Sequence, residues 1–273
     1  MGFRPPWPPD GYRRRVPPPR VRNFGLKDVF TLVNLLSGVV AIHYVVAGQL
    51  PRAGYAVIVG YLGGDLLDGT VARLTGTGNR FGAEFDAISD HFVHVVVPGL
   101  IVYSAYRRGG HELVGLGLMG TLVATATIRH ARLAAERFDF PLCWCGLPRT
   151  ISGFVAMSFP LSHTFFAANP YRYATGVAVI VPLCVLNLVP IPYMTHRGQR
   201  AMQPWAKALV AVYFAAPAVM FLADRADLFD VFFVGAAGYA VTGWFPVRRD
   251  ERRAFYAEYR RWSAALAGAG RAG

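Results

Sequence analysis

Four aspartates at helical spacings lie inside a stretch of apolar sequence. Asp65 and Asp68 are three residues apart and Asp86 and Asp90 are four apart, so each pair shares one face of a helix. Charged groups are costly in a bilayer segment and mark a functional site by default. Close carboxylates repel one another unless cations neutralise them, and Mg²⁺ binds through a few carboxylates plus substrate phosphates. The pattern predicts divalent metal ions that handle a diphosphate.

Small residues and one arginine accompany the acids in fixed register. Gly69, Ala72 and Gly82 remove side-chain bulk where a flat group could approach the backbone, and Arg73 can pair with a phosphate through its planar fork. Packing between membrane helices explains the small residues, but it does not explain four acids. An ion or proton pathway is the alternative interpretation, although a carrier has no evident need for these residues in register with the acids.

The elements that must position these residues are membrane helices. Hydrophobic residues make up 54% of the 273 residues and charged residues 16%, whereas soluble domains are about 25% charged. We therefore predict an all-α, polytopic membrane helix bundle. A short linker makes the two acid-bearing helices antiparallel neighbours, so the acids converge. The sequence has eight apolar stretches long enough to cross a hydrocarbon core of about 30 Å, at 28–48, 52–74, 82–106, 112–135, 150–167, 171–194, 207–223 and 229–246.

The net charge of +12 is distributed asymmetrically. If the N-terminus is cytoplasmic and eight spans follow, 23 of the 28 Lys and Arg residues lie on the cytoplasmic side, as the positive-inside rule requires. These charges also suit anionic lipid headgroups and anionic substrates. The sequence has no soluble basic domain to carry a nucleic-acid function. We expect an integral protein of the cell membrane, with its N-terminus and its site on the cytoplasmic side and no nucleic-acid partner.

The chain divides into three segments. Residues 1–25 are rich in Pro and Arg and are expected to form a disordered basic tail, and residues 26–246 form the membrane domain. Residues 247–273 are a basic cytoplasmic tail, in which arginines and aromatic residues interleave at near-helical spacing. That tail fits either an interfacial amphipathic helix or an ordinary polar helix end. The three cysteines are interpreted as structural, because one C-x-C pair does not complete a tetrahedral metal site.

The spacing D-x-x-D-G-x-x-A-R-x₈-G-x-x-x-D-x-x-x-D resembles the signature of the CDP-alcohol phosphatidyltransferase family, with every defining position filled. The resemblance implies a six-helix catalytic core, a homodimer, and transfer of a phosphatidyl group from a CDP-linked lipid to a small polar alcohol with release of CMP. It implies two Mg²⁺ or Mn²⁺ ions, with Asp90 also removing the proton of the acceptor hydroxyl. The implied metal ligands are Asp65, Asp68, Asp86 and Asp90, and the implied CDP-binding residues are Asp65, Gly69, Ala72, Arg73 and Gly82.

Three further stretches resemble the phosphatidylserine or archaetidylserine synthase branch of that family. They are T-L-V-N-L-L-S-G at 31–38, R-H-A-R-L at 129–133 with G-L-P at 146–148, and V-P-I-P-Y-M at 189–194. This resemblance favours L-serine as the acceptor and CDP-diacylglycerol or CDP-archaeol as the donor. The run H-F-V-H at 91–94 departs from the branch, which usually has S-F-G in this region. Inositol phosphate, glycerol phosphate or another small alcohol therefore remain alternative acceptors.

Several cationic residues are candidates for the acceptor pocket. Arg129, Arg132 and Arg149 could hold either the phosphate of a phosphorylated acceptor or the carboxylate of serine, so they do not separate the two. His94 is a further candidate for the acceptor pocket. Two alternative roles stay open for it: an interior histidine that bonds to neighbouring helices, or a metal ligand. Asn34, inside the first span, could reach the substrate or form a hydrogen bond across helices.

Overall fold

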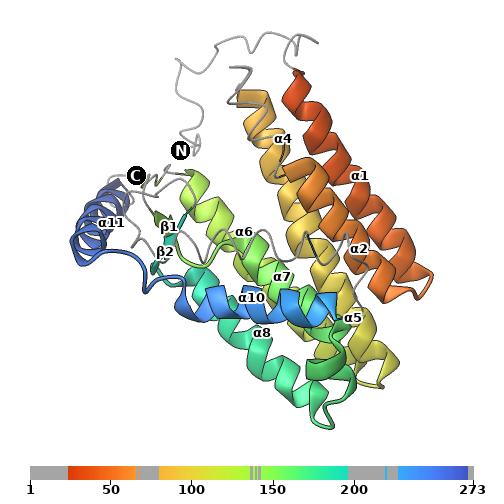
Figure 1. The fold of residues 1–273 in the computed structure, drawn as a ribbon. Helices are drawn as coiled ribbons and strands as arrows, with labels where there is room; N and C mark the ends of the chain where they lie inside the picture. Colours follow the sequence, from red (N-terminus) through yellow and green to blue (C-terminus); the bar gives the residue numbers. More distant parts are fainter. Residues whose placement is uncertain are drawn as a thin grey trace, which may run out of the picture.

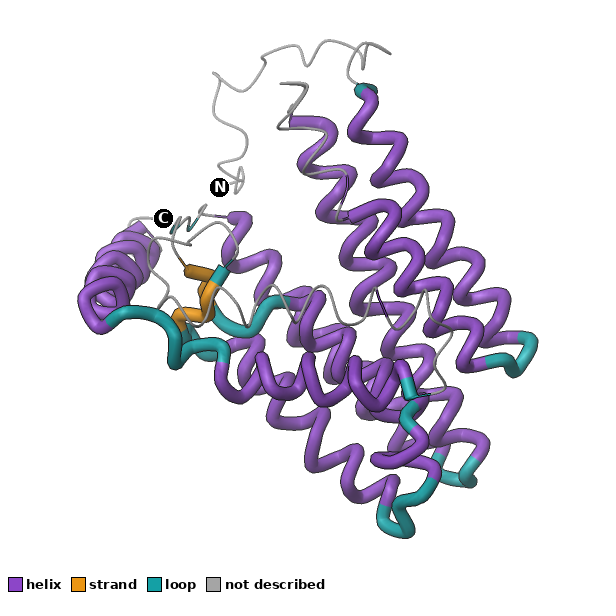
Figure 2. Tube along the Cα trace, viewed as in Figure 1, coloured by secondary structure: helices purple, strands orange, loops and turns teal. Residues whose placement is uncertain are grey.

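Figure 1 shows the fold in a computed structural model, which describes residues 24–65, 67, 80–135, 138, 140, 143–195, 219 and 227–269. Helices form most of the described chain, and the two strands are short (Figure 2). The helices are α1 (Leu26–Val46), α2 (Leu50–Gly60), α4 (Arg80–His91), α5 (Val97–Arg108), α6 (Glu112–Ala135), α7 (Arg149–Leu161), α8 (Arg172–Leu188), α10 (Leu228–Thr242) and α11 (Arg249–Ala269); the π-helical turns are η2 (Tyr61–Asp65), η3 (Phe92–Val96) and η4 (His163–Ala167); the strands are β1 (Cys143–Cys145) and β2 (Pro192–Met194).

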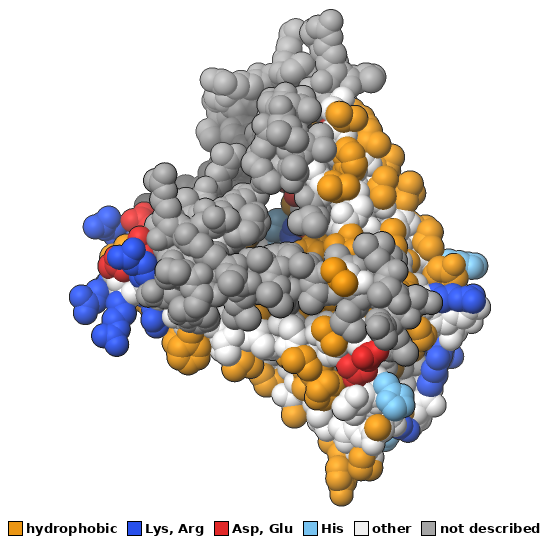
Figure 3. Space-filling view, viewed as in Figure 1, with side chains coloured by type: hydrophobic (Ala, Val, Ile, Leu, Met, Phe, Trp, Pro, Cys, Tyr) orange, Lys and Arg blue, Asp and Glu red, His pale blue; other side chains and the backbone are white. Residues whose placement is uncertain are grey.

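The structure confirms the all-α membrane bundle. Within the described residues, three helices are long and apolar enough to cross a membrane, at Leu26–Val46, Phe81–Arg108 and Glu112–Ala134. The helices α8 and α10 are apolar but shorter. Apolar side chains gather on the outer edge of the molecule over α1 (Figure 3). Lipid tails can cover such a surface without cost, which is why α1 exposes valines and leucines along its length.

Two predicted spans end earlier than expected. The stretch 150–167 is divided at Ser162, where extended backbone separates α7 from η4. The stretch 171–194 leaves the helix after Leu188, because Pro190 and Pro192 cannot donate the backbone bonds that a helix needs and restrict the residues before them. The stretch 207–223 lies outside the described residues apart from Val219, so the number of eight spans stays a prediction.

Small residues bring α1 close to α2 and η2. A Cβ on Gly60 would overlap the side chain of Ser37, and a Cβ on Gly64 would overlap the backbone of α1 at Asn34. Glycines let membrane helices approach at their backbones. This contact fixes η2, which carries Asp65, against the face of α1 that carries Asn34.

The apolar core lies between α1, α2, α5, α7 and α10. Phe154 of α7 is buried at its centre and makes edge-to-face ring contacts with Tyr61, His94 and Phe232. Because α7 is buried along most of its length, the residue at its first turn is held rigidly. That residue is Arg149.

A two-stranded ribbon joins the segment before α7 to the segment after α8. Strands β1 and β2 pair antiparallel, with Trp144 opposite Tyr193. The helix α11 packs on this ribbon, because Phe255 is fully buried in a cluster with Cys143 and Cys145. Charged side chains cover the outer face of α11 (Figure 3). The basic tail contains the helix α11, and both interpretations of it, as an interfacial helix or as a polar helix end, stay predictions.

Candidate functional site

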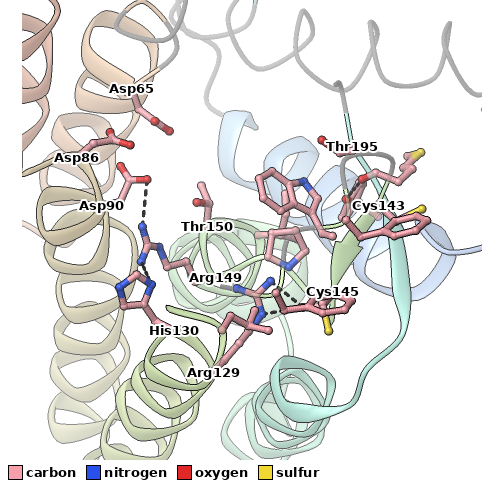
Figure 4. A pocket seen from close by; sticks show the side chains of 18 of the residues that line it. Asp65, Asp86, Asp90, Arg129, His130, Cys143, Cys145, Arg149, Thr150 and Thr195 are labelled. Carbon is pink, nitrogen blue, oxygen red and sulfur yellow. Dashed lines mark hydrogen bonds and ion pairs between the residues drawn. The ribbon is translucent and has the colours of Figure 1, made fainter. Parts of the chain in front are cut away.

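A cavity of about 460 Å³ opens between the acid-bearing helices and the ribbon. Figure 4 shows Asp65, Asp86 and Asp90 on one wall, facing Arg149 and His130 on the other. The cavity is lined by Tyr61, Asp65, Asp86, Asp90, Arg129, His130, Leu133, Phe138, Phe140, Cys143, Trp144, Cys145, Pro148, Arg149, Thr150, Ile151, Met194, Thr195 and Tyr239.

The structure brings three of the four predicted acids to this cavity. Asp65 ends the π-helical turn η2, and Asp86 and Asp90 lie one turn apart on α4, directly before the π-helical turn η3. Turns of this type are rare and are found frequently at functional sites. Asp68, the fourth acid, lies outside the described residues, and so do Gly69, Ala72 and Arg73.

Asp90 is held from two sides. The Asn34 side-chain amide donates to Asp90 Oδ1 at 3.2 Å from the buried face of α1. Arg149 Nη2 lies 3.5 Å from Asp90 Oδ2. The Asp90 side chain is 13% exposed and lines the cavity. Two fixed contacts therefore orient one acid at the cavity wall.

His94 lies one helical turn beyond Asp90 and is completely buried. Its Nε2 is 3.6 Å from Asp90 Oδ1 and 3.7 Å from Asp65 Oδ2. The structure therefore places His94 against the acids, beneath the cavity lining. His91, three residues earlier, instead faces Thr127, with 3.0 Å between Nε2 and Oγ1.

The opposite wall is positioned by a tight turn after β1. Gly146 has φ of 71°, a left-handed conformation that favours glycine. Pro148 then precedes the first turn of α7, where the missing backbone N–H of a proline costs nothing, and Arg149 begins the helix. Arg149 Nη1 lies 3.1 Å from His130 Nδ1 of α6. The guanidinium thus lies between His130 and Asp90 in the cavity lining (Figure 4).

The other two predicted arginines bond to backbone carbonyls. Arg129 is buried and donates from Nε and Nη2 to the carbonyl of Cys145, at 3.1 and 2.8 Å. Arg132 donates from Nη2 to the carbonyl of Leu188 at 2.9 Å. Arg129 therefore binds the end of β1, and Arg132 binds the end of α8. Arg149 differs from them because it contacts two side chains that line the cavity, those of His130 and Asp90.

Gly82 faces α1 in the described structure. A Cβ at this position would overlap the side chains of Lys27 and Asp28, both of which are buried. Gly82 does not appear among the residues that line the cavity. A larger residue here would force the side chains of Lys27 and Asp28 to shift, so Gly82 favours the close approach of α4 to α1.

Several residues of the cavity wall lie outside the predicted site. His130 lines the cavity, and its position in the sequence directly after Arg129, a predicted site residue, could have indicated this. Tyr61, Thr150 and Thr195 also line the cavity. Thr195 follows β2, and no spacing in the sequence places it in a cavity with the acids of α4.

The donor set of the acidic wall suits a hard divalent cation. Asp86 Oδ1 is buried and has no hydrogen-bond partner within the part of the chain that the structure describes. Asp65, Asp90 and His94 offer ligand atoms that all lie within 4.8 Å of one another. Buried carboxylates without protein partners are costly unless cations balance them. Carboxylate oxygens are the ligands that Mg²⁺ and Mn²⁺ take most readily.

The cysteines are free, buried thiols. Cys143 and Cys145 lie in β1, outside the membrane-spanning helices, and burial raises the pKa of both thiols, that of Cys143 to about 12. A thiolate is the form that attacks substrates or binds metals. These two thiols therefore line the cavity as apolar groups, in agreement with a structural interpretation.

Comparison with known proteins gives a family match over most of the membrane domain. A family model described as CDP-alcohol phosphatidyltransferase matches residues 25–188. The chain is 27% identical over 169 residues to the CDP-diacylglycerol–serine O-phosphatidyltransferase of Helicobacter pylori strain J99, covering 60% of this chain and 70% of that protein. It is 35% identical over 182 residues to the archaetidylserine synthase of Methanothermobacter thermautotrophicus, covering 64% of this chain and 72% of that protein. A Methanocaldococcus jannaschii protein with the same name as the first is 24% identical over 179 residues, covering 61% and 73%.

Proposed function

The chain belongs to the CDP-alcohol phosphatidyltransferase family, and from that premise we propose that it transfers the phosphatidyl group of a CDP-linked lipid to the hydroxyl of L-serine and releases CMP. Membership makes it an integral membrane transferase of phospholipid biosynthesis rather than an ion carrier. The observation that carries the serine assignment is the pairing of Arg149 with Asp90 across the cavity, at 3.5 Å. A cation beside an acid suits an acceptor that has a carboxylate near its reacting hydroxyl.

The charges of the described cavity favour a carboxylate over a phosphate. Of the three predicted arginines, two bond to the carbonyls of Cys145 and Leu188. Arg149 presents its guanidinium to the cavity, with His130 beside it. A phosphorylated acceptor carries close to two negative charges and calls for several cations, whereas serine carries a single carboxylate. Arg149 can bind that carboxylate with its planar fork.

Asp90 is the proposed general base. The serine oxygen attacks the phosphorus on the lipid side of the diphosphate, and the bond from this phosphorus to the oxygen bridging to CMP breaks. Asp90 takes the proton of the serine hydroxyl, and CMP leaves with the bonding electron pair. The amide of Asn34 holds Asp90 Oδ1 and limits rotation of the carboxylate. A positioned carboxylate in this role contributes typically 10²–10⁴-fold to rate.

The acidic wall is the proposed metal site. Bound divalent metals supply charge neutralisation on the diphosphate and on the leaving phosphate. Their binding requires that the carboxylates stay ionised and face the cavity, as the backbones of η2 and α4 arrange them. The proposed metal ligands are Asp65, Asp68, Asp86 and Asp90, and the proposed CDP-binding residues are Asp65, Gly69, Ala72, Arg73 and Gly82, on the strength of the sequence motif.

The orientation and assembly of the protein are part of the same proposal. The asymmetric distribution of Lys and Arg favours a cytoplasmic N-terminus and a cavity that opens to the cytoplasm, in the cell membrane. A water-soluble nucleotide product and serine would then exchange on the cytoplasmic side. A homodimer is proposed on the family resemblance.

A CMP-release assay on the purified protein tests this function. CDP-diacylglycerol or CDP-archaeol is supplied with Mn²⁺ or Mg²⁺, and L-serine, inositol phosphate and glycerol 3-phosphate are offered in turn. We expect CMP with L-serine, loss of CMP release in Asp90→Asn, and full activity in the control Asp250→Asn, an exposed acid on α11. CMP with a phosphorylated acceptor alone would overturn the serine assignment. No CMP with any acceptor would overturn the proposed donor.

A further inference from the structure

His94 combines three properties that seldom occur together. It is completely buried, both of its ring nitrogens lack a hydrogen-bond partner within the described residues, and Nε2 faces two carboxylates. A buried polar atom without a partner costs about 1–3 kcal/mol. Each such group in a native structure calls for an explanation, and an ion at the site is one.

The two carboxylate contacts are too long to satisfy the ring. Nε2 lies 3.6 Å from Asp90 and 3.7 Å from Asp65, beyond the 2.7–3.2 Å of an N–H···O hydrogen bond. All three ligand atoms lie within 4.8 Å of one another. One ion can span that separation, because divalent metals sit about 2.0–2.6 Å from their ligands.

The surroundings of His94 hold its ring in place. Tyr61 and Phe154 contact the ring edge to face, with centroids 5.8 and 5.5 Å away. A Cβ on Gly153 of α7 would overlap the backbone carbonyl of His94, so the two helices are in close contact there. The ring therefore has little freedom to turn Nε2 away from Asp65 and Asp90.

We propose that His94 is a nitrogen ligand of the metal site, shared with Asp65 and Asp90, and that the site therefore prefers a transition-metal ion such as Mn²⁺ to Mg²⁺. Imidazole is a softer donor than carboxylate and suits first-row transition metals, whereas Mg²⁺ takes oxygen ligands. This inference rests on the metal site of the proposed function and adds to it a ligand outside the aspartate motif.

Pulsed electron paramagnetic resonance of bound Mn²⁺ tests the proposal without an activity measurement. The purified protein in detergent is loaded with substoichiometric Mn²⁺, and modulation from a coupled ¹⁴N nucleus is recorded. We expect ¹⁴N modulation that becomes ¹⁵N modulation when the protein is made with ¹⁵N-histidine. His94→Phe should abolish it, because phenylalanine fills the same aromatic site without a nitrogen. His91→Phe is the matched control, since it makes the same change three residues away and should keep the signal.

Metal competition supplies the second readout. In the wild type we expect Mn²⁺ to resist displacement by Mg²⁺, and in His94→Phe we expect that preference to fall about tenfold or more, within the range for altered metal sites. If His94→Phe fails to fold, the signal is assigned by elimination. A ¹⁵N-sensitive signal that persists in both His91→Phe and His130→Phe belongs to His94 among the histidines near the site.

The outcomes separate this inference from the proposed function. Mn²⁺ binding that Asp90→Asn weakens, with no nitrogen coupling in the wild type, would keep the metal site and overturn the role of His94. Absence of Mn²⁺ binding, with and without CDP-lipid, would overturn both the metal site and this inference.

Discussion

Replacing Arg149 by glutamine removes the cation that faces Asp90 across the cavity. Arg149 Nη2 lies 3.5 Å from Asp90 Oδ2, and its side chain is 14% exposed, so its interactions with an acceptor would be largely shielded from water. A hydrogen bond to a charged group contributes about 1.5–3 kcal/mol, and each 1.36 kcal/mol corresponds to a factor of ten in rate. We therefore expect kcat/KM for L-serine to fall roughly 10- to 100-fold in Arg149→Gln.

The assay is the initial rate of CMP release at saturating CDP-lipid over a range of serine concentrations. Most of the change should appear as a higher KM for serine, because the carboxylate is bound equally in the ground state and in the transition state. Arg149→Lys keeps the charge but loses the planar fork, so it should recover part of the loss. Arg253→Gln on the exposed face of α11 is the control and should leave both constants unchanged.

Two results would refute this reasoning. An unchanged KM for serine with a raised KM for the CDP-lipid would show that Arg149 binds the diphosphate. A loss of thermal stability equal to the loss of activity would show that Arg149 acts through folding, in which case Arg149→Lys would recover stability and kcat together.

Three further predictions concern the supporting structure. Asn34→Ala removes the donor to Asp90 and should lower kcat about tenfold with little change in KM; an unchanged kcat would contradict a positioning role. Gly60→Val would overlap the first helix and should cost about 1–3 kcal/mol of stability in thermal unfolding, whereas Gly63→Val meets no neighbouring atom and should not; equal melting temperatures would refute the close contact. Burial raises the pKa of Cys143 to about 12, so its thiolate is scarce at pH 8; iodoacetamide should label it in denaturant but not in the folded protein, as read by mass spectrometry.

The acidic wall of the site was predictable because its signal is local. Spacings of three and four residues put Asp86 and Asp90 on one helix face, and apolar stretches fixed which segments form helices. The structure brings Asp65, Asp86 and Asp90 to one cavity. His94 could have been placed by the same rule, since it lies four residues beyond Asp90 and therefore on the same face.

The opposite wall could not be predicted because it depends on contacts between distant segments. Arg129 and Arg149 are alike in the sequence, but the first bonds to the carbonyl of Cys145 and the second reaches Asp90. Arg129 bonds to the carbonyl at the end of β1, a strand of three residues, so its contact depends on where that strand ends. Strands of that length carry no periodic signal, and the apolar residues of β2 extend the predicted span 171–194.

The two walls of the cavity come from different parts of the chain. The acids belong to the segment before residue 109. His130 belongs to α6, Arg149 to α7, and Thr195 to the residues that follow β2. Under the proposed function, the residues that would hold the diphosphate and those that would bind the alcohol therefore lie in separate stretches of the chain. If these proposed roles hold, a chimera that exchanged residues 112–195 between family members would keep the reaction and change the product headgroup, so membranes of different surface charge could arise by recombination within a single scaffold.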